Sequence, residues 1–95
     1  MIIKAEITRT FKDKGALLAS AAIIFEDGED SFIVKNLRVI NGERGVFVAM
    51  PGFKGRNGKY IDNCFPLNPE THDKVQRIVL DAYDEADKSG DQDEM

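Results

Sequence analysis

The sequence contains little cysteine, histidine or proline and no tryptophan: Cys64 and His72 are each the only residue of their type among 95 residues. A single cysteine cannot form an internal disulfide, which fits a reducing compartment. No apolar run approaches the roughly 18 residues that a membrane span requires. The N-terminus does not resemble a signal peptide, because Lys4 interrupts its apolar run. The sequence therefore predicts a cytoplasmic protein that does not contact membranes.

The shortage of cysteine and histidine also restricts catalytic and metal chemistry. A structural zinc site uses four such ligands, and a nucleophilic pair of Cys64 and His72 would lack a third, orienting group. The simpler roles are a small buried hydrophobe and a first-turn helix residue. Gly52, Gly55 and Gly58 do not have the spacing of a phosphate-binding loop. We therefore expect no enzyme activity, no cofactor, no metal and no small-molecule substrate.

Charge is distributed unevenly along the chain, whose net charge is −4. Residues 1–68 carry ten Lys/Arg and eight Asp/Glu, whereas residues 69–95 carry three Lys/Arg and nine Asp/Glu. Between residues 35 and 59, six cations are accompanied by one acid, Glu43. Because the local field at a binding face matters more than total charge, this segment is a candidate contact for a polyanion. The same pattern is also typical of an ordinary solvated surface.

Alternating and apolar segments predict a sheet in the first part of the chain. Strands are expected over residues 3–9, 17–25, 32–40 and 45–50, with a short return strand over 60–65. Asn41-Gly42-Glu43 predicts a hairpin turn, since the Asn-Gly pair accepts positive φ angles. Pro51 should end the fourth strand because it lacks a backbone donor.

A long helix is predicted to follow the strands. Asn68-Pro69-Glu70 provides an N-cap side chain, a proline at the first helical position and a carboxylate in the first turn. An apolar stripe follows at Val75, Ile78, Val79, Ala82 and Ala86. The fold class is therefore α+β: a small antiparallel sheet of four to five strands followed by a long C-terminal helix. We expect one domain over residues 1–88 and an acidic, disordered tail over 89–95.

The apolar strands also predict a partner subunit. Residues 17–25 and 45–50 are apolar at successive positions, so both faces of those strands favour burial, whereas one face of an antiparallel sheet is normally wet. One helix covers only one face of such a sheet. A second copy of the chain is the simplest cover for the other face, so we expect a homodimer. Coverage by loops and the helix alone is the alternative.

The segment 53–60 places three cations and two aromatic residues on a glycine-rich hairpin. Cations there could neutralise phosphates, and Phe53 or Tyr60 could stack on an unpaired base. A solvated turn whose aromatic residues pack inward fits these residues equally well. Lys74 and Arg77 lie three positions apart on the exposed side of the helix and could add two further cations. The candidate nucleic-acid contacts are Lys54, Arg56, Lys59, Lys74, Arg77 and Arg44.

Two successive segments resemble the signature of the stage V sporulation protein G family, a group of septation regulators. They are Phe32-Ile33-Val34-Lys35-Asn36-Leu37-Arg38-Val39-Ile40-Asn41-Gly42 and Gly45-Val46-Phe47-Val48-Ala49-Met50-Pro51. A basic glycine hairpin, Asp62, Pro66-Leu67-Asn68 and a terminal helix then follow in the expected order, so the resemblance covers roughly residues 2–86.

The resemblance implies a small homodimeric bacterial regulator that is linked to septation and sporulation genes and binds DNA, and in some members RNA. It also implies that Lys54, Arg56 and Lys59 on the hairpin, and the helix that carries Lys74 and Arg77, are functional. The chain departs from typical members in the hairpin, where Gly55 separates two cations that are usually adjacent.

Two alternatives to a nucleic-acid-binding regulator remain at this point. The first is a protein-interaction module that recruits a partner through a dimeric sheet and the acidic helix without contacting nucleic acid. The second is a small enzyme that uses Cys64 and His72.

Overall fold

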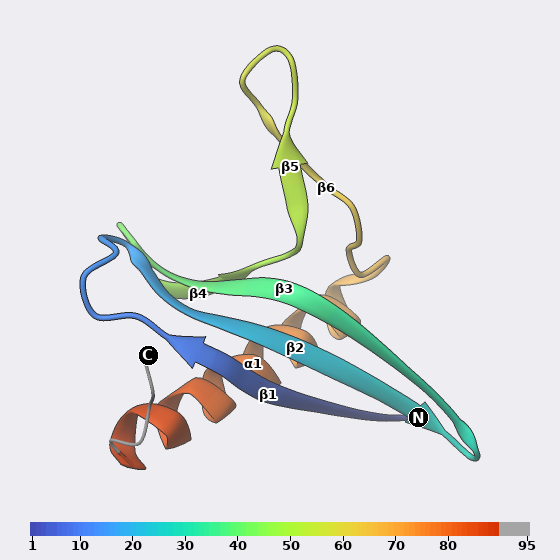
Figure 1. Cartoon of the computed structure of the whole chain (residues 1–95). Coiled ribbons are helices and arrows are strands. Elements are labelled where there is room, and N and C mark those ends of the chain that lie inside the picture. The colour runs from blue at the N-terminus through green and yellow to red at the C-terminus, as the bar shows by residue number, and fades with distance from the viewer. Residues whose placement is uncertain (90–95) are drawn as a thin grey trace.

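The computed structural model describes residues 1–89, which form six strands and one helix (Figure 1). The main antiparallel sheet has the order β1 (Ile2–Thr10), β2 (Leu17–Asp27), β3 (Asp30–Gly42) and β4 (Gly45–Ala49). A second, two-stranded sheet pairs β5 (Gly52–Lys54) with β6 (Tyr60–Asp62), and α1 (Pro69–Ser89) ends the described chain. The predicted α+β class is confirmed. The predicted tail lies outside the described residues except for Ser89, which ends the helix.

The register of the sheet assigns its side chains to two faces. Val39 on β3 lies opposite Ala19 on β2 and Val48 on β4, and all three are buried. These side chains share one face because neighbouring residues in register point to the same side of a sheet. Arg38 lies opposite Ser20 and Ala49 in the same way and therefore belongs to the other face. We call the first the helix face and the second the open face.

The helix face holds the hydrophobic core. Val75 and Val79 of α1 are 2% and 0% exposed and pack against the buried strand residues, whereas Ile78 is half-buried. Figure 1 shows α1 lying across the sheet on one side. Burying apolar surface on one stripe of the helix and one face of the sheet is the main favourable contribution to this arrangement. Within the predicted stripe Val75 and Val79 are confirmed as core residues, whereas the packing of Leu80 and Tyr83 against the core was not predicted.

The start of α1 has the predicted cap. The Asn68 side-chain oxygen accepts a hydrogen bond of 2.9 Å from the backbone N–H of Thr71, one of the donors that an uncapped helix leaves unpaired. Two turns into the helix, Gln76 bonds to the outer edge of β4: its Nε2 donates to the Val48 carbonyl at 2.9 Å, and its Oε1 accepts from the Val48 N–H at 3.0 Å. One helical side chain therefore covers part of an otherwise open sheet edge.

A bulge interrupts β3 next to Asn36. Ala21 pairs with Leu37 and Ile23 pairs with Val34, so Ala22 lies opposite two residues, one of which is Asn36. Asn36 has a φ of 70°, the only positive value among non-glycine residues in the described chain. Asparagine tolerates this left-handed conformation better than most residues, and bulges redirect the side chains that they carry. Asn36 with its positive φ is therefore part of the bulge, two positions before Arg38 on β3.

The turn between β3 and β4 differs from the predicted one. Gly42 pairs with Gly45, so Glu43 and Arg44 occupy the turn, and Asn41 remains in the strand. The backbone N–H of Asn41 donates to the Ala16 carbonyl at 2.8 Å, a bond that ties the end of β3 to the loop between β1 and β2. A tertiary hydrogen bond thus extends the strand past the Asn-Gly pair. Within residues 1–89, no helix has the length and apolarity needed to cross a membrane.

Candidate functional site

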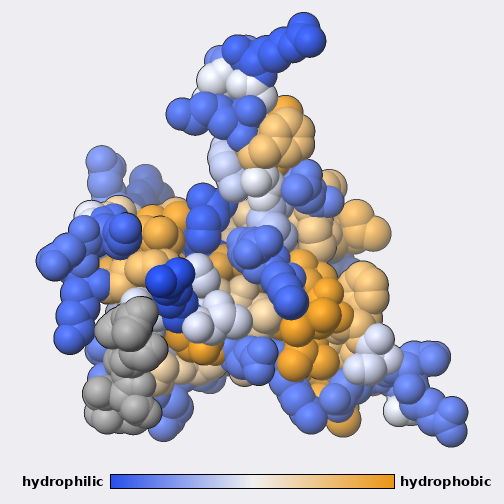
Figure 2. Space-filling view, viewed as in Figure 1, coloured by the Kyte–Doolittle hydropathy of each residue, from blue (hydrophilic) through white to orange (hydrophobic). Residues whose placement is uncertain are grey.

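The hairpin of β5 and β6 projects away from the main sheet, and its tip is hydrophilic (Figures 1 and 2). Gly52 begins it at a point where a Cβ atom would collide with the backbone of Ile61 and Asp62, so the two strands can approach closely only because this residue is glycine. Gly58 turns the tip with a φ of 84°, and the Asn57 side chain accepts a 3.1 Å hydrogen bond from the Lys59 N–H. Local chemistry therefore fixes the shape of the hairpin.

The structure brings three of the predicted contacts together on this hairpin. Lys54, Arg56 and Lys59 are all exposed. None of them forms an ion pair within the described residues. Their charge is therefore not compensated locally, and a projecting, exposed hairpin can approach a polyanion without obstruction by the rest of the protein. The return strand expected over residues 60–65 is confirmed only for Tyr60–Asp62 (β6), and its partner strand β5 was not predicted.

The two sides of the hairpin differ in chemistry. Lys54 lies opposite Tyr60, whereas Phe53 lies opposite Ile61. Because paired residues share a face, Lys54 and Tyr60 form one side and the two apolar residues form the other. The Tyr60 ring lies under the Arg38 guanidinium, with 4.5 Å between the guanidinium carbon and the ring centroid. The side that carries Lys54 and Tyr60 therefore faces the open face of the sheet, whereas Phe53, which is 52% exposed, lies on the other side of the hairpin.

The other predicted contacts lie elsewhere. Arg44 occupies the turn between β3 and β4, at an end of the main sheet rather than on the hairpin. Lys74 and Arg77 are exposed on α1, the element that covers the helix face, whereas the hairpin contacts the open face through Arg38. The six residues predicted from the sequence thus divide into three separate locations.

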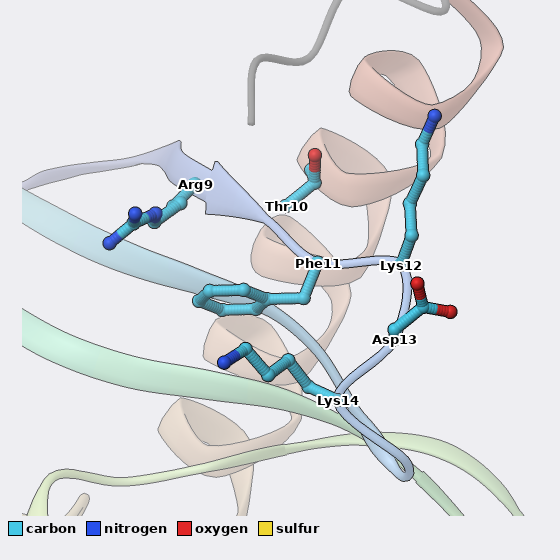
Figure 3. A pocket seen from close by; sticks show the side chains of 6 residues that line it. All are labelled: Arg9, Thr10, Phe11, Lys12, Asp13 and Lys14. Atoms are coloured by element: carbon cyan, nitrogen blue, oxygen red, sulfur yellow. The ribbon is translucent and has the colours of Figure 1, made fainter. Parts of the chain in front are cut away.

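A further group of cations, which was not predicted from the sequence, lies at the turn between β1 and β2 (Figure 3). A pocket of about 310 Å³ there is lined by Arg9, Phe11, Lys12 and Lys14 among others. The Arg9 guanidinium carbon lies 5.6 Å from the centroid of the Phe11 ring. The bond between Asn41 and Ala16 ties this turn to the end of β3, so Arg44 belongs to the same end of the sheet. The sequence contains a signal for this group of cations, since residues 9–14 carry three cations and a single acid, Asp13.

Cys64 and His72 occupy ordinary structural positions. Cys64 is half-buried and packs against the core. His72 is exposed, and its Nδ1 lies 3.3 Å from a carboxylate oxygen of its neighbour Asp73. Residues 1–89 contain no group of three or more His, Cys, Asp and Glu side chains placed to hold a metal ion.

The fold and the hairpin define a small α+β protein whose exposed cations project from a four-stranded sheet. The sequence model of the SpoVG family matches residues 1–85. The chain is 40% identical over 79 residues to a Lachnospira eligens protein named "Putative septation protein SpoVG", covering 83% of this chain and 86% of that one. Proteins of the same name from Caldanaerobacter subterraneus and Lachnoclostridium phytofermentans are 33% and 37% identical, over 82% and 86% of this chain and 82% and 85% of theirs. The chain belongs to the SpoVG family.

Proposed function

We propose that this protein is a non-enzymatic, cytoplasmic regulator that binds nucleic acid through the β5–β6 hairpin and acts as a homodimer. The observation that carries the proposal is the exposure of Lys54, Arg56 and Lys59 together on a projecting hairpin, without an ion pair in the described chain. Cations in this arrangement bind phosphates and release the counterions that surround a nucleic acid. Membership of a family named for septation supports a regulatory role.

The acidic part of the chain supports the same assignment by its position. The second half of α1 carries Asp81, Asp84, Glu85 and Asp87. This helix packs on the helix face, whereas the hairpin contacts the open face through Arg38 and Tyr60. Repulsion between carboxylates and phosphates falls with distance and is screened over about 10 Å at 0.1 M salt. The net charge of −4 is therefore compatible with binding of a polyanion at the hairpin.

The open face supports the homodimer. Ile2 and Ile33 lie on this face by register and are 57% and 45% exposed, and the half-buried Ile24 pairs with Ile33. Figure 2 shows hydrophobic residues gathered below the base of the hairpin. A symmetric second copy packed on this face would cover these exposed isoleucines.

Salt-dependent binding tests the nucleic-acid proposal. The triple variant Lys54→Gln, Arg56→Gln, Lys59→Gln is compared with wild type by fluorescence anisotropy on a labelled oligonucleotide at several salt concentrations. Each lost phosphate contact lowers the slope of log affinity against log salt by about 0.7–0.9, so the triple variant should lose about 2–3 in slope. Its circular dichroism spectrum should match that of wild type, because these side chains are exposed.

Two control variants separate the hairpin from the other cations. Lys12→Gln, Lys14→Gln, Arg44→Gln removes the same number of charges at one end of the sheet, and Lys74→Gln, Arg77→Gln removes those of the helix. Both should retain most of the salt slope. Wild-type protein that binds neither DNA nor RNA at low salt would refute the proposal, as would equal losses in the triple variant and its charge-matched control.

Sedimentation equilibrium tests the homodimer. Wild type should sediment with twice the mass of the chain, and Ile33→Lys should shift it to one chain mass because a charge then lies in the apolar patch. Phe53→Lys, on the outer side of the hairpin, is the matched control and should remain dimeric. A monomeric wild type at the highest soluble concentration contradicts this part of the proposal.

A further inference from the structure

A pocket of about 350 Å³ lies between the open face of the sheet and the base of the hairpin. Ser20, Asn36 and Arg38 line it from the sheet, and Tyr60 and Asn63 line it from the hairpin and the segment after it. The volume falls within the range of about 300–1,000 Å³ that is typical of small-ligand sites. These residues come from three separate parts of the chain and meet only in the folded structure.

The pocket carries a positive charge that is not neutralised locally. The Nη2 atom of Arg38 donates one hydrogen bond, of 3.1 Å, to the Met50 carbonyl, and this bond orients the guanidinium. Arg38 forms no ion pair within residues 1–89, and none of the described residues that line the pocket carries a carboxylate. A guanidinium has five N–H donors, so most of them remain available for an anion.

The same pocket offers an aromatic surface. The Arg38 guanidinium lies over the Tyr60 ring at 4.5 Å, and Tyr60 lines the pocket and remains 46% exposed. Aromatic rings and arginine planes are the surfaces on which proteins stack unpaired bases. An apolar side chain alone would bind a lipid or a hydrophobic peptide. An aromatic ring beside a guanidinium that has no ion pair instead fits a ligand in which a planar group is attached to an anion.

Two amides complete the pocket. Asn36 and Asn63 line it, and within the described chain their side chains make no hydrogen bond to another protein group. An amide presents both a donor and an acceptor, as the edge of a base does. Asn36 is also the residue at the bulge with a φ of 70°, and unusual backbone conformations concentrate at functional sites. Asn36 and Arg38, two positions apart on β3, line the same pocket.

We propose that this pocket holds one unpaired nucleotide of a single-stranded nucleic acid. Its base stacks on Tyr60, its edge bonds to Asn36 or Asn63, and its phosphate is bound by Arg38. Lys54 lies on the same side of the hairpin as Tyr60 and binds the adjacent phosphate. This inference rests on the proposed nucleic-acid function and makes it specific, since it selects single strands over duplexes. A base within a duplex is already stacked on both faces and paired at its edge, so it cannot enter the pocket.

Anisotropy titrations with a labelled single-stranded oligonucleotide and the duplex of the same sequence test the proposal. Wild type should prefer the single strand by about tenfold, the effect of one stacked base. Tyr60→Leu should lose about tenfold on the single strand and nothing on the duplex, whereas Tyr60→Phe retains the ring and should bind as wild type does. Arg38→Gln should weaken single-strand binding, and thermal melting reports whether each variant folds.

A second measurement uses the wild-type pocket and does not depend on altering it. The chain has no tryptophan and two tyrosines, so the conservative variant Tyr83→Phe leaves Tyr60 as the only tyrosine emitter. Stacking of a base on Tyr60 should quench this emission when the single strand saturates the protein. Addition of the duplex, or of the mononucleotide at the same concentration, should leave the emission nearly unchanged.

The outcomes separate this proposal from the proposed function. If Tyr60→Leu binds the single strand as wild type does, or if Tyr60 emission is unchanged at saturation, the pocket proposal fails, while loss of binding in the hairpin triple variant still supports the broader function. A mononucleotide that binds as tightly as the oligonucleotide also refutes it, because the ligand would then be a free nucleotide. Failure of wild type to bind any nucleic acid refutes both.

Discussion

The β5–β6 hairpin and the body formed by the main sheet and α1 are both built on antiparallel strand pairs, but they use their side chains differently. In the body, the residues that face α1 include Ile23 and Val39, which are at most 1% exposed. In the hairpin, every residue from Phe53 to Asp62 is exposed except Gly55. A two-stranded hairpin is marginally stable alone, so the body must support it. The buried residues that stabilise the fold and the exposed cations of the hairpin therefore lie in different parts of the molecule.

The supports of the hairpin are few and identifiable. The backbone N–H of Asn63 donates to the Pro51 carbonyl at 2.7 Å and closes the base of the hairpin. Arg38 links the hairpin to the body, since it stacks on Tyr60 and bonds to the Met50 carbonyl. Substitutions of the exposed hairpin residues should therefore leave the core nearly unchanged, provided that these anchors remain.

The largest expected effect comes from the same substitution made in the two regions. Ile23→Ala removes a fully buried side chain from the core and should lower the free energy of unfolding by about 3 kcal/mol. Ile61→Ala, at a position that is 47% exposed on the hairpin, should cost less than about 1 kcal/mol. Urea unfolding followed by circular dichroism measures both. Equal losses would show that the hairpin belongs to the cooperative core and would invalidate the comparison.

A smaller effect is expected where the helix covers the edge of β4. Gln76→Ala deprives the buried Val48 of partners for both its N–H and its carbonyl, which should cost about 2 kcal/mol of unfolding free energy. Arg77→Ala, one position further along α1 and exposed, is the matched control and should change stability by less than about 0.5 kcal/mol. Chemical denaturation of the two variants checks this, and similar losses would mean that the edge contact contributes little.

The smallest expected effect is a dependence of stability on alkaline pH. Burial against the core raises the pKa of Tyr83, and the nearby carboxylates of Asp87 and Asp84 raise it further. The folded protein therefore holds this proton more tightly than the unfolded chain, whose tyrosine pKa is about 10. The resulting stabilisation is complete below about pH 10 and is lost as pH rises through the higher folded value.

Thermal melts of wild type and Tyr83→Phe across this range test the assignment. Wild type should lose stability more steeply than the variant as pH increases, because phenylalanine has no proton to release. Parallel curves for the two proteins would show that Tyr83 does not contribute to the alkaline dependence.

Local patterns predicted most of the secondary structure. The alternation of residues 3–9 lies within β1, and the Asn68-Pro69 start is confirmed by the cap on Thr71. These features depend on neighbours a few residues apart, so the sequence contains the whole of their cause. The predicted turn Asn41-Gly42-Glu43 shares only Glu43 with the turn between β3 and β4, because a tertiary hydrogen bond from Asn41 to Ala16 keeps the Asn-Gly pair within the strand.

The candidate site was predicted only in part. The three hairpin cations lie within the six residues 54–59 and were predicted as contacts, whereas Arg38 was not among the predicted contacts. Its contact with Tyr60 spans 22 positions, and the bond of Gln76 to Val48 spans 28. Such pairs depend on sheet register and helix docking, which a one-dimensional pattern does not specify. The bulge at Asn36 was missed for the same reason.

The four strands of the main sheet, the capped helix, the basic hairpin and the asymmetry of charge follow from the sequence, because propensity, turn chemistry and ionisation belong to residues and their close neighbours. Only the tertiary structure decided that the hairpin contacts the face opposite α1, that Arg44 and the helix cations lie away from it, and that Arg38 meets Tyr60 above a pocket. Those outcomes follow from burial of one sheet face against one helix, a choice that the whole chain makes together.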